Sequence, residues 1–147
     1  MLINFNILMA ETYMMQGAYA KKDECMKYIF RNYRSLPLDD ADLLSLAQYF
    51  SSFANYDKAE QVLENRINDI AVDRDLLFYY LNLTIIDEPT TQKPEYRKVM
   101  LNAISLDRPR FCSLFKPFGY GGVTFQLLDN SYLRSTWCEN CQGIYVK

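Results

Sequence analysis

The sequence predicts an all-α fold built from about three stacked antiparallel helical hairpins. Three observations lead to this prediction. Apolar residues recur at three- and four-residue steps along most of the first 107 residues, short polar turns separate these stretches, and acidic residues stand where helices would begin. The 147 residues, 50% hydrophobic and 23% charged, have the size and balance of one globular domain or a short repeat array.

The clearest predicted hairpin runs from Asp39 to about Asn68. Asp39 can cap the first helix, and Asp42 stands three residues later in the capping-box position. Because the turn at 55–57 is so short, the two helices must pack antiparallel. The positions expected to face inward and pack the repeat are Leu43, Leu46, Ala47, Phe50, Ala59 and Leu63.

These six residues resemble a tetratricopeptide (TPR) repeat, whose first helix carries large, large, small and aromatic residues and whose second carries a small and a large one. Arg66 and Ala71 depart from the family, which usually has a small residue and a proline there. The resemblance implies a right-handed α-α superhelix with a concave groove along the first helix of each pair. By the same resemblance, the peptide-binding groove positions are Ala41, Leu44, Gln48, Ser51 and Ser52.

A weaker copy of the pattern lies about 34 residues earlier, the TPR period. There Cys25 and Ile29 occupy the two second-helix positions, while the first-helix positions match poorly. Terminal repeats are often atypical. A first hairpin is therefore also expected, with Pro37 where the repeat-closing proline belongs.

A third hairpin is expected after the central one. Asp73 or Asp75 would cap its first helix, a polar loop over 87–94 would follow, and a returning helix is expected over 95–105. The hairpin repeats are thus predicted to occupy residues 1–107.

The remaining residues, 108–147, are expected to form a compact C-terminal element packed on the last hairpin. Pro109 suits the first turn of a short helix, the alternation over 123–127 suggests an extended segment, and Asp129 or Asn130 would cap a final helix that buries Leu133 and Trp137. One continuous helix from residue 123 is the alternative.

The four cysteines leave several interpretations open. The string Trp137-Cys138-Glu139-Asn140-Cys141 resembles a thioredoxin-type redox motif but lacks the preceding strand and following long helix. A zinc site would draw on Cys138, Cys141 and Cys112, yet a structural site needs four ligands. The favoured interpretation is that these cysteines are reduced, partly buried thiols, with no metal and no cofactor, and that Cys25 is a small core residue.

Composition excludes several classes of function. The chain has no histidine, which removes the commonest general base and metal ligand. Its net charge of −2 and lack of a basic run argue against nucleic-acid binding. The longest apolar run is too short to span a bilayer, and the start does not resemble a signal peptide, so a cytoplasmic location is expected without membrane association. No catalytic residues can be proposed, and the chain is not expected to be an enzyme.

The function that the resemblance implies is a non-catalytic scaffold or adaptor that binds a protein or peptide in a TPR-like groove. The groove positions carry no Lys, Arg or Asn, so the carboxylate clamp of some TPR proteins is not expected. One alternative is a helical accessory region of a larger enzyme, because the first residues read as if already inside a helix. Another is a small module stabilised by cysteine-bound zinc. A homo-oligomer is also possible.

Overall fold

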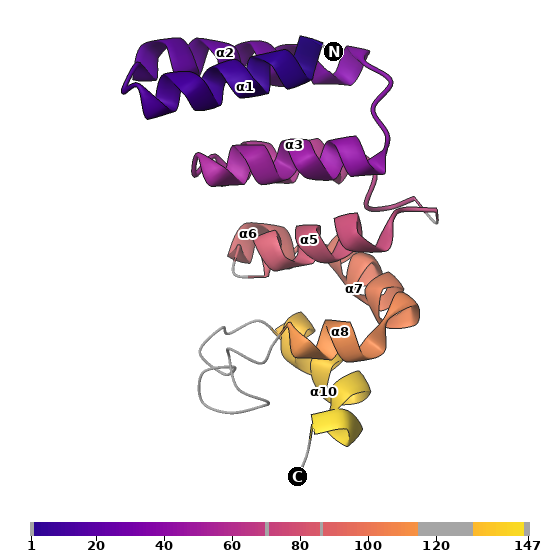
Figure 1. Cartoon of the computed structure of the whole chain (residues 1–147). Helices are drawn as coiled ribbons and strands as arrows, with labels where there is room; N and C mark the ends of the chain where they lie inside the picture. The colour runs from indigo at the N-terminus through magenta and orange to yellow at the C-terminus, as the bar shows by residue number, and fades with distance from the viewer. Residues whose placement is uncertain (1, 70, 86, 115–130, 146–147) are drawn as a thin grey trace. The chain divides into compact units, whose positions relative to one another are not determined.

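The computed structural model describes residues 2–69, 71–85, 87–114 and 131–145, and every regular element within them is a helix (Figure 1). The all-α prediction is therefore confirmed for the described residues. The chain divides into two compact units, Met1–Val62 and Leu63–Lys147. The boundary predicted after residue 107, between the hairpin repeats and the C-terminal element, falls within the second of these units. The C-terminal helices pack on the helix that precedes them.

The first unit begins with the hairpin of α1 (Leu2–Met15) and α2 (Tyr19–Asn32), which lie side by side (Figure 1). Gly17, with φ of 75°, ends α1 in a left-handed conformation. The amide of Ala18 donates to the carbonyl of Tyr13 at 2.8 Å and that of Gly17 to Met14 at 3.1 Å. This pattern is a Schellman motif, in which glycine is the favoured residue.

The second hairpin of this unit starts with α3 (Asp40–Ser52) and its predicted capping box. The Asp42 amide donates to Asp39 Oδ1 at 2.8 Å, and the Asp39 amide donates to Asp42 Oδ2 at 3.2 Å. A second Schellman motif ends α3: the Asn55 amide donates to Phe50 O at 2.9 Å, with Ala54 at a φ of 61°. Helix α4 (Tyr56–Glu64) then begins, so the helix–turn–helix prediction is confirmed.

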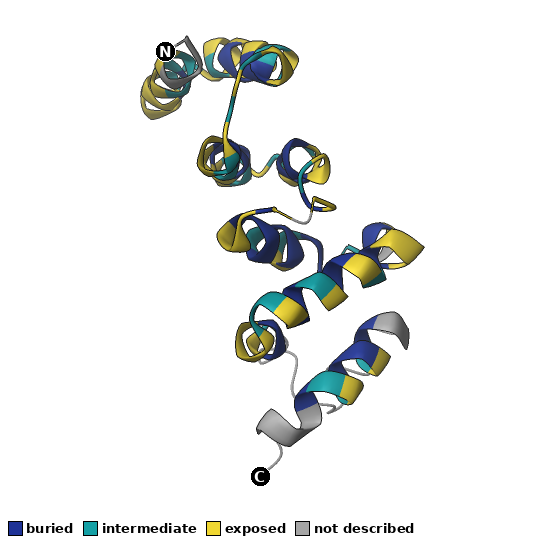
Figure 2. Cartoon of the chain, turned by 90° about the vertical axis from the view of Figure 1, so that its right-hand side faces the viewer, coloured by how far each residue is buried: buried dark blue, intermediate teal, exposed yellow. Residues whose placement is uncertain are grey.

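The core of the first unit follows the predicted pattern. All six predicted packing residues are buried, the most exposed being Leu43 at 9%; five of them lie in this unit, and Leu63 is the first residue of the second. Cys25 and Ile29 of α2 are also buried. The rings of Phe30 and Phe50 meet edge to face with centroids 5.8 Å apart, which joins α2 to α3. Figure 2 shows the resulting buried and exposed stripes on the helices.

The second unit contains the predicted third hairpin, formed by α5 (Arg74–Thr84) and α7 (Pro94–Leu106). Asp73, not Asp75, is the cap, and its Oδ2 accepts from the amides of Asp75 and Leu76. Thr84 Oγ1 is hydrogen-bonded to Tyr96 OH at 2.9 Å inside this pair. The intervening polar loop includes a short helix, α6 (Glu88–Thr91), which the sequence analysis did not anticipate.

Two C-terminal helices, α8 (Arg108–Ser113) and α10 (Ser131–Tyr145), pack on α7 and on each other. Pro109 lies in the first turn of α8, as predicted, and Asp107 caps the helix by accepting a hydrogen bond from the Arg110 amide at 3.1 Å. Leu133 and Trp137 are buried as predicted. The extended segment expected over 123–127, its continuous-helix alternative and the caps at 129–130 lie outside the described residues.

Candidate functional site

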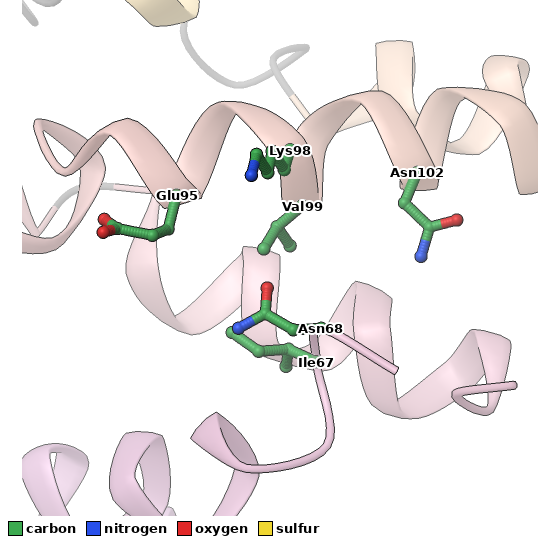
Figure 3. Close-up of a pocket in the computed structure, with 6 residues that line it drawn as sticks. All are labelled: Ile67, Asn68, Glu95, Lys98, Val99 and Asn102. Carbon is green, nitrogen blue, oxygen red and sulfur yellow. The ribbon is translucent and has the colours of Figure 1, made fainter. Parts of the chain in front are cut away.

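A hollow of about 420 Å³ lies in the second unit, between α7 and the turn that follows α4. Figure 3 shows residues of α7 on one side and Ile67 and Asn68 on the other, with Val99 pointing toward them. The α7 positions recur at helical spacing because residues three and four apart lie on one face. The full lining is Ile67, Asn68, Glu95, Lys98, Val99 and Asn102.

The lining combines an apolar base with a polar rim. Ile67 and Val99 are buried, with 6% and 2% of their surfaces exposed. The rim holds two amides, a carboxylate and an ammonium group. Within the described part of the chain, no hydrogen bond or ion pair engages any of the four rim side chains, including Glu95 and Lys98, which stand three residues apart on α7. Their donors and acceptors are therefore available to a ligand.

The chemistry of this rim is suited to recognition. The carboxamides of Asn68 and Asn102 each offer donors and an acceptor, Glu95 offers an acceptor carboxylate, and Lys98 offers three donors. The volume of the hollow falls within the range of roughly 300–1,000 Å³ that is usual for ligand pockets. Such a surface can pair with a polypeptide backbone while Ile67 and Val99 contact an apolar side chain.

Sequence reasoning did not identify this hollow. Its residues come from two segments about a hairpin apart, and Ile67 was expected to lie on a helix that in fact ends at Glu64. The rim residues Glu95, Lys98 and Asn102 look like an ordinary solvated helix face when read alone. Only the packing of α7 places them opposite Asn68.

The predicted groove residues share the accessible side of α3. Ala41, Gln48 and Ser52 are exposed, and Leu44 and Ser51 are half-buried. The buried packing residues occupy the opposite side of the same helix. This face is therefore available for contact, and it carries no charge.

The structure corrects the prediction of reduced thiols for two of the cysteines. Cys112 of α8 and Cys141 of α10 form a disulfide, with Cα atoms 5.5 Å apart and a separation of 29 positions in the sequence. Both are fully buried, whereas Cys25 and Cys138 are free. The two cysteines come within bonding distance because α8 packs against α10. Their spacing in the sequence does not reveal this pairing.

The disulfide also excludes the alternative zinc site and the pairing of cysteines within the redox-like motif. A cysteine binds zinc as its thiolate, so the bonded sulfurs of Cys112 and Cys141 are not ligands. Within the described ranges, no group of three or more potential metal ligands gathers. Cys141 pairs with Cys112 rather than with its motif partner Cys138.

A second surface feature lies on the first hairpin. Helix α1 is apolar around most of its circumference and leaves large side chains in solvent, with Phe5 59%, Leu8 62% and Met15 89% exposed. Among the helices that the structure describes, none is both long and apolar enough to traverse a bilayer.

Comparisons with known protein families, with characterised proteins and with solved structures gave no match.

Proposed function

We propose that the chain is a non-catalytic protein- or peptide-binding module, and that the hollow beside α7 receives an extended peptide segment. The observation that carries the proposal is the unpaired rim of Asn68, Glu95, Lys98 and Asn102 above the apolar base. Opposite charges at this spacing on a helix surface gain only about 0.2–0.5 kcal/mol by pairing, so a ligand can engage them at little cost. Here they remain available for a partner.

The chemistry favours a peptide over other ligands. A backbone amide group has one donor and one acceptor, which a carboxamide can match at the same time. Asn68 and Asn102 supply two such groups from the two sides of the hollow. Lys98 and Glu95 would select a peptide with an acidic and a basic side chain, and the apolar base would hold one aliphatic side chain between them.

The TPR-like arrangement remains part of this proposal. The matched packing residues and the two capped hairpins support a repeat architecture. The uncharged face of α3, with Gln48 at its centre, is the alternative contact surface that the TPR resemblance implies. A cytoplasmic location remains a prediction, and the buried Cys112–Cys141 disulfide weighs against it because such bonds persist mainly in oxidising compartments.

A peptide selection tests the proposal. A displayed library of random linear peptides would be selected on the full chain, and the enriched peptides would be titrated by calorimetry against the wild type and three variants. Lys98→Glu reverses the charge in the hollow, Gln48→Arg places a charge on the α3 face, and Lys27→Glu is a matched control on an exposed part of α2.

We expect enriched peptides to bind with dissociation constants on the order of micromolar and to lose about tenfold or more in affinity on Lys98→Glu. Lys27→Glu should leave the affinity unchanged. A loss of affinity confined to the Gln48→Arg variant would place the binding site on α3, and the chain would still be a peptide-binding module. If no peptide is enriched, or if the control variant weakens binding as much as Lys98→Glu does, the proposed function is wrong.

A further inference from the structure

The cysteines near the end of the chain have a property that peptide binding does not use. The disulfide joins Cys112 to Cys141, and the free thiol of Cys138 lies three residues before Cys141 on the same helix, α10. Side chains three residues apart on a helix are surface neighbours, with Cβ atoms about 5–6 Å apart. Cys141 therefore has two cysteines near it, one bonded and one free.

Cys141 can in principle bond to either neighbour. Disulfides form between cysteines whose Cα atoms are roughly 4.4–6.8 Å apart, and the observed pair is at 5.5 Å. Three helical steps along α10 give an axial rise of about 4.5 Å, which with the turn of the helix puts the Cα atoms in the same range. The helical turn between them has to adjust on bonding, because a disulfide brings its Cβ atoms to roughly 3.5–4.5 Å. One bond would cross between helices, and the other would lie within α10.

The surroundings of the three sulfurs assign them different roles. Cys112 and Cys141 are fully buried, so an external thiol cannot approach them directly in the folded state. Cys138 is only partly buried and free. An internal thiol next to a buried disulfide can reach it without any need for solvent access.

We propose that Cys138 exchanges with the Cys112–Cys141 disulfide. The Cys138 thiol loses its proton to water, and its thiolate attacks Sγ of Cys141. A Cys138–Cys141 bond forms, the Cys112–Cys141 bond breaks, and Cys112 leaves as a thiolate that takes up a proton. No electron is gained or lost overall, so no oxidant or reductant is required.

The exchange moves the covalent link and thereby changes what it holds. In the observed state the link anchors the six-residue α8 to α10. In the exchanged state the link lies inside α10, and α8 retains only non-covalent contacts such as the hydrogen bond from Trp137 Nε1 to Cys112 O at 3.3 Å. The pair of states is a switch that holds or releases α8.

The first experiment maps the disulfides of the Cys112→Ser variant by non-reducing peptide mass spectrometry after equilibration in a glutathione redox buffer. The full chain is used, and circular dichroism verifies that it remains helical. We expect the Cys138–Cys141 bond. Free thiols at both positions in a helical chain, or pairing of Cys138 with Cys25, would overturn the proposal.

The second experiment uses the native disulfide and does not depend on that variant. The rate at which dithiothreitol opens the Cys112–Cys141 bond would be followed by alkylation and mass spectrometry in the wild type, in Cys138→Ser and in the control Cys25→Ser. If Cys138 relays the exchange, Cys138→Ser should slow opening by about threefold or more, and the control should match the wild type. Equal rates in all three proteins would contradict the relay.

Discussion

The two units of the molecule differ in the interactions that stabilise each of them internally. Helices α1, α2 and α3 of the first unit have 13 or 14 residues each and are joined by side-chain packing, such as the edge-to-face contact of Phe30 and Phe50. The second includes α8, only six residues long, and has a disulfide and several ion pairs between helices. Helices shorter than about 12–15 residues are marginal alone, so the short one needs external anchors.

Arg110 illustrates this anchoring in the second unit. Its guanidinium group lies 2.9 Å from a carboxylate oxygen of Asp75 and 4.5 Å from the centre of the Phe78 ring. Both partners belong to α5, so a single side chain fastens α8 to it. The first unit shows the contrast: within the described residues its cation–π contacts, such as Lys58 over Phe30, accompany the close packing of α1 on α2.

The largest expected effects come from the buried aromatic at the centre of each unit. Trp137→Ala should lower the free energy of unfolding of the second unit by about 3–5 kcal/mol, because a fully buried ring is lost and a cavity remains. Phe50→Ala is the matched change in the first unit and should cost a similar amount there. Urea unfolding followed by hydrogen exchange would assign each loss to its unit. Equal loss in both units from either variant would mean that they unfold together.

Reducing the disulfide should affect the stability of the two units differently. The bond closes a loop of about 30 residues, so its loss is expected to destabilise the second unit by about 3 kcal/mol. Amide exchange of α8 and α10 should accelerate in a phosphine reductant, and that of α1 and α2 should not change. A uniform acceleration along the chain would contradict the assignment of the anchor to one unit.

The two Schellman turns of the first unit offer a smaller and internally controlled test. Gly17 and Ala54 both have left-handed φ angles, 75° and 61°, but only the first is a glycine. Ala54→Gly should raise the unfolding free energy by roughly 0.5–1 kcal/mol, since a Cβ is unfavourable in that conformation. Gly17→Ala should lower it by a similar amount although nothing lies near the added carbon. Thermal melts would measure both, and a stabilising Gly17→Ala would refute the argument.

The smallest effect concerns Tyr49, whose buried hydroxyl has no hydrogen-bond partner among the described residues. Burial, with a smaller contribution from Glu11 and Cys25, raises the pKa of Tyr49 well above its ordinary value of 10.0. The stability linked to its proton is therefore complete below pH 10 and is lost as the pH rises above it. Tyr49→Phe should gain up to about 1 kcal/mol at pH 7 by removing the unpaired hydroxyl.

The pH dependence supplies the control for this variant. The gain of Tyr49→Phe over the wild type should widen above pH 10, because only the wild type has this tyrosine to ionise on unfolding. Urea unfolding at pH 7, 9 and 10.5 would measure the difference. A gap that stays constant or narrows would show that Tyr49 is not held in its neutral form.

Local signals predicted the helices well, whereas contacts distant in sequence were not predictable. The Asp39–Asp42 capping box and the buried stripe ending at Leu63 are properties of neighbouring residues, so the sequence reveals them. The Cys112–Cys141 bond depends on how separate segments pack, and so does the placing of Asn68 and Asn102 around one hollow. A periodic pattern indicates which side of a helix is buried but not against which segment it packs.

The most direct test of the proposed function is hydrogen exchange of the full chain with and without a peptide selected on it. The account predicts slower exchange around Asn68 and along residues 95–102, with no change on the exposed face of α3 around Gln48. Protection confined to α3 would place binding in the groove that the TPR resemblance implies. Protection on neither surface would contradict the proposal that this chain binds peptides through the hollow beside α7.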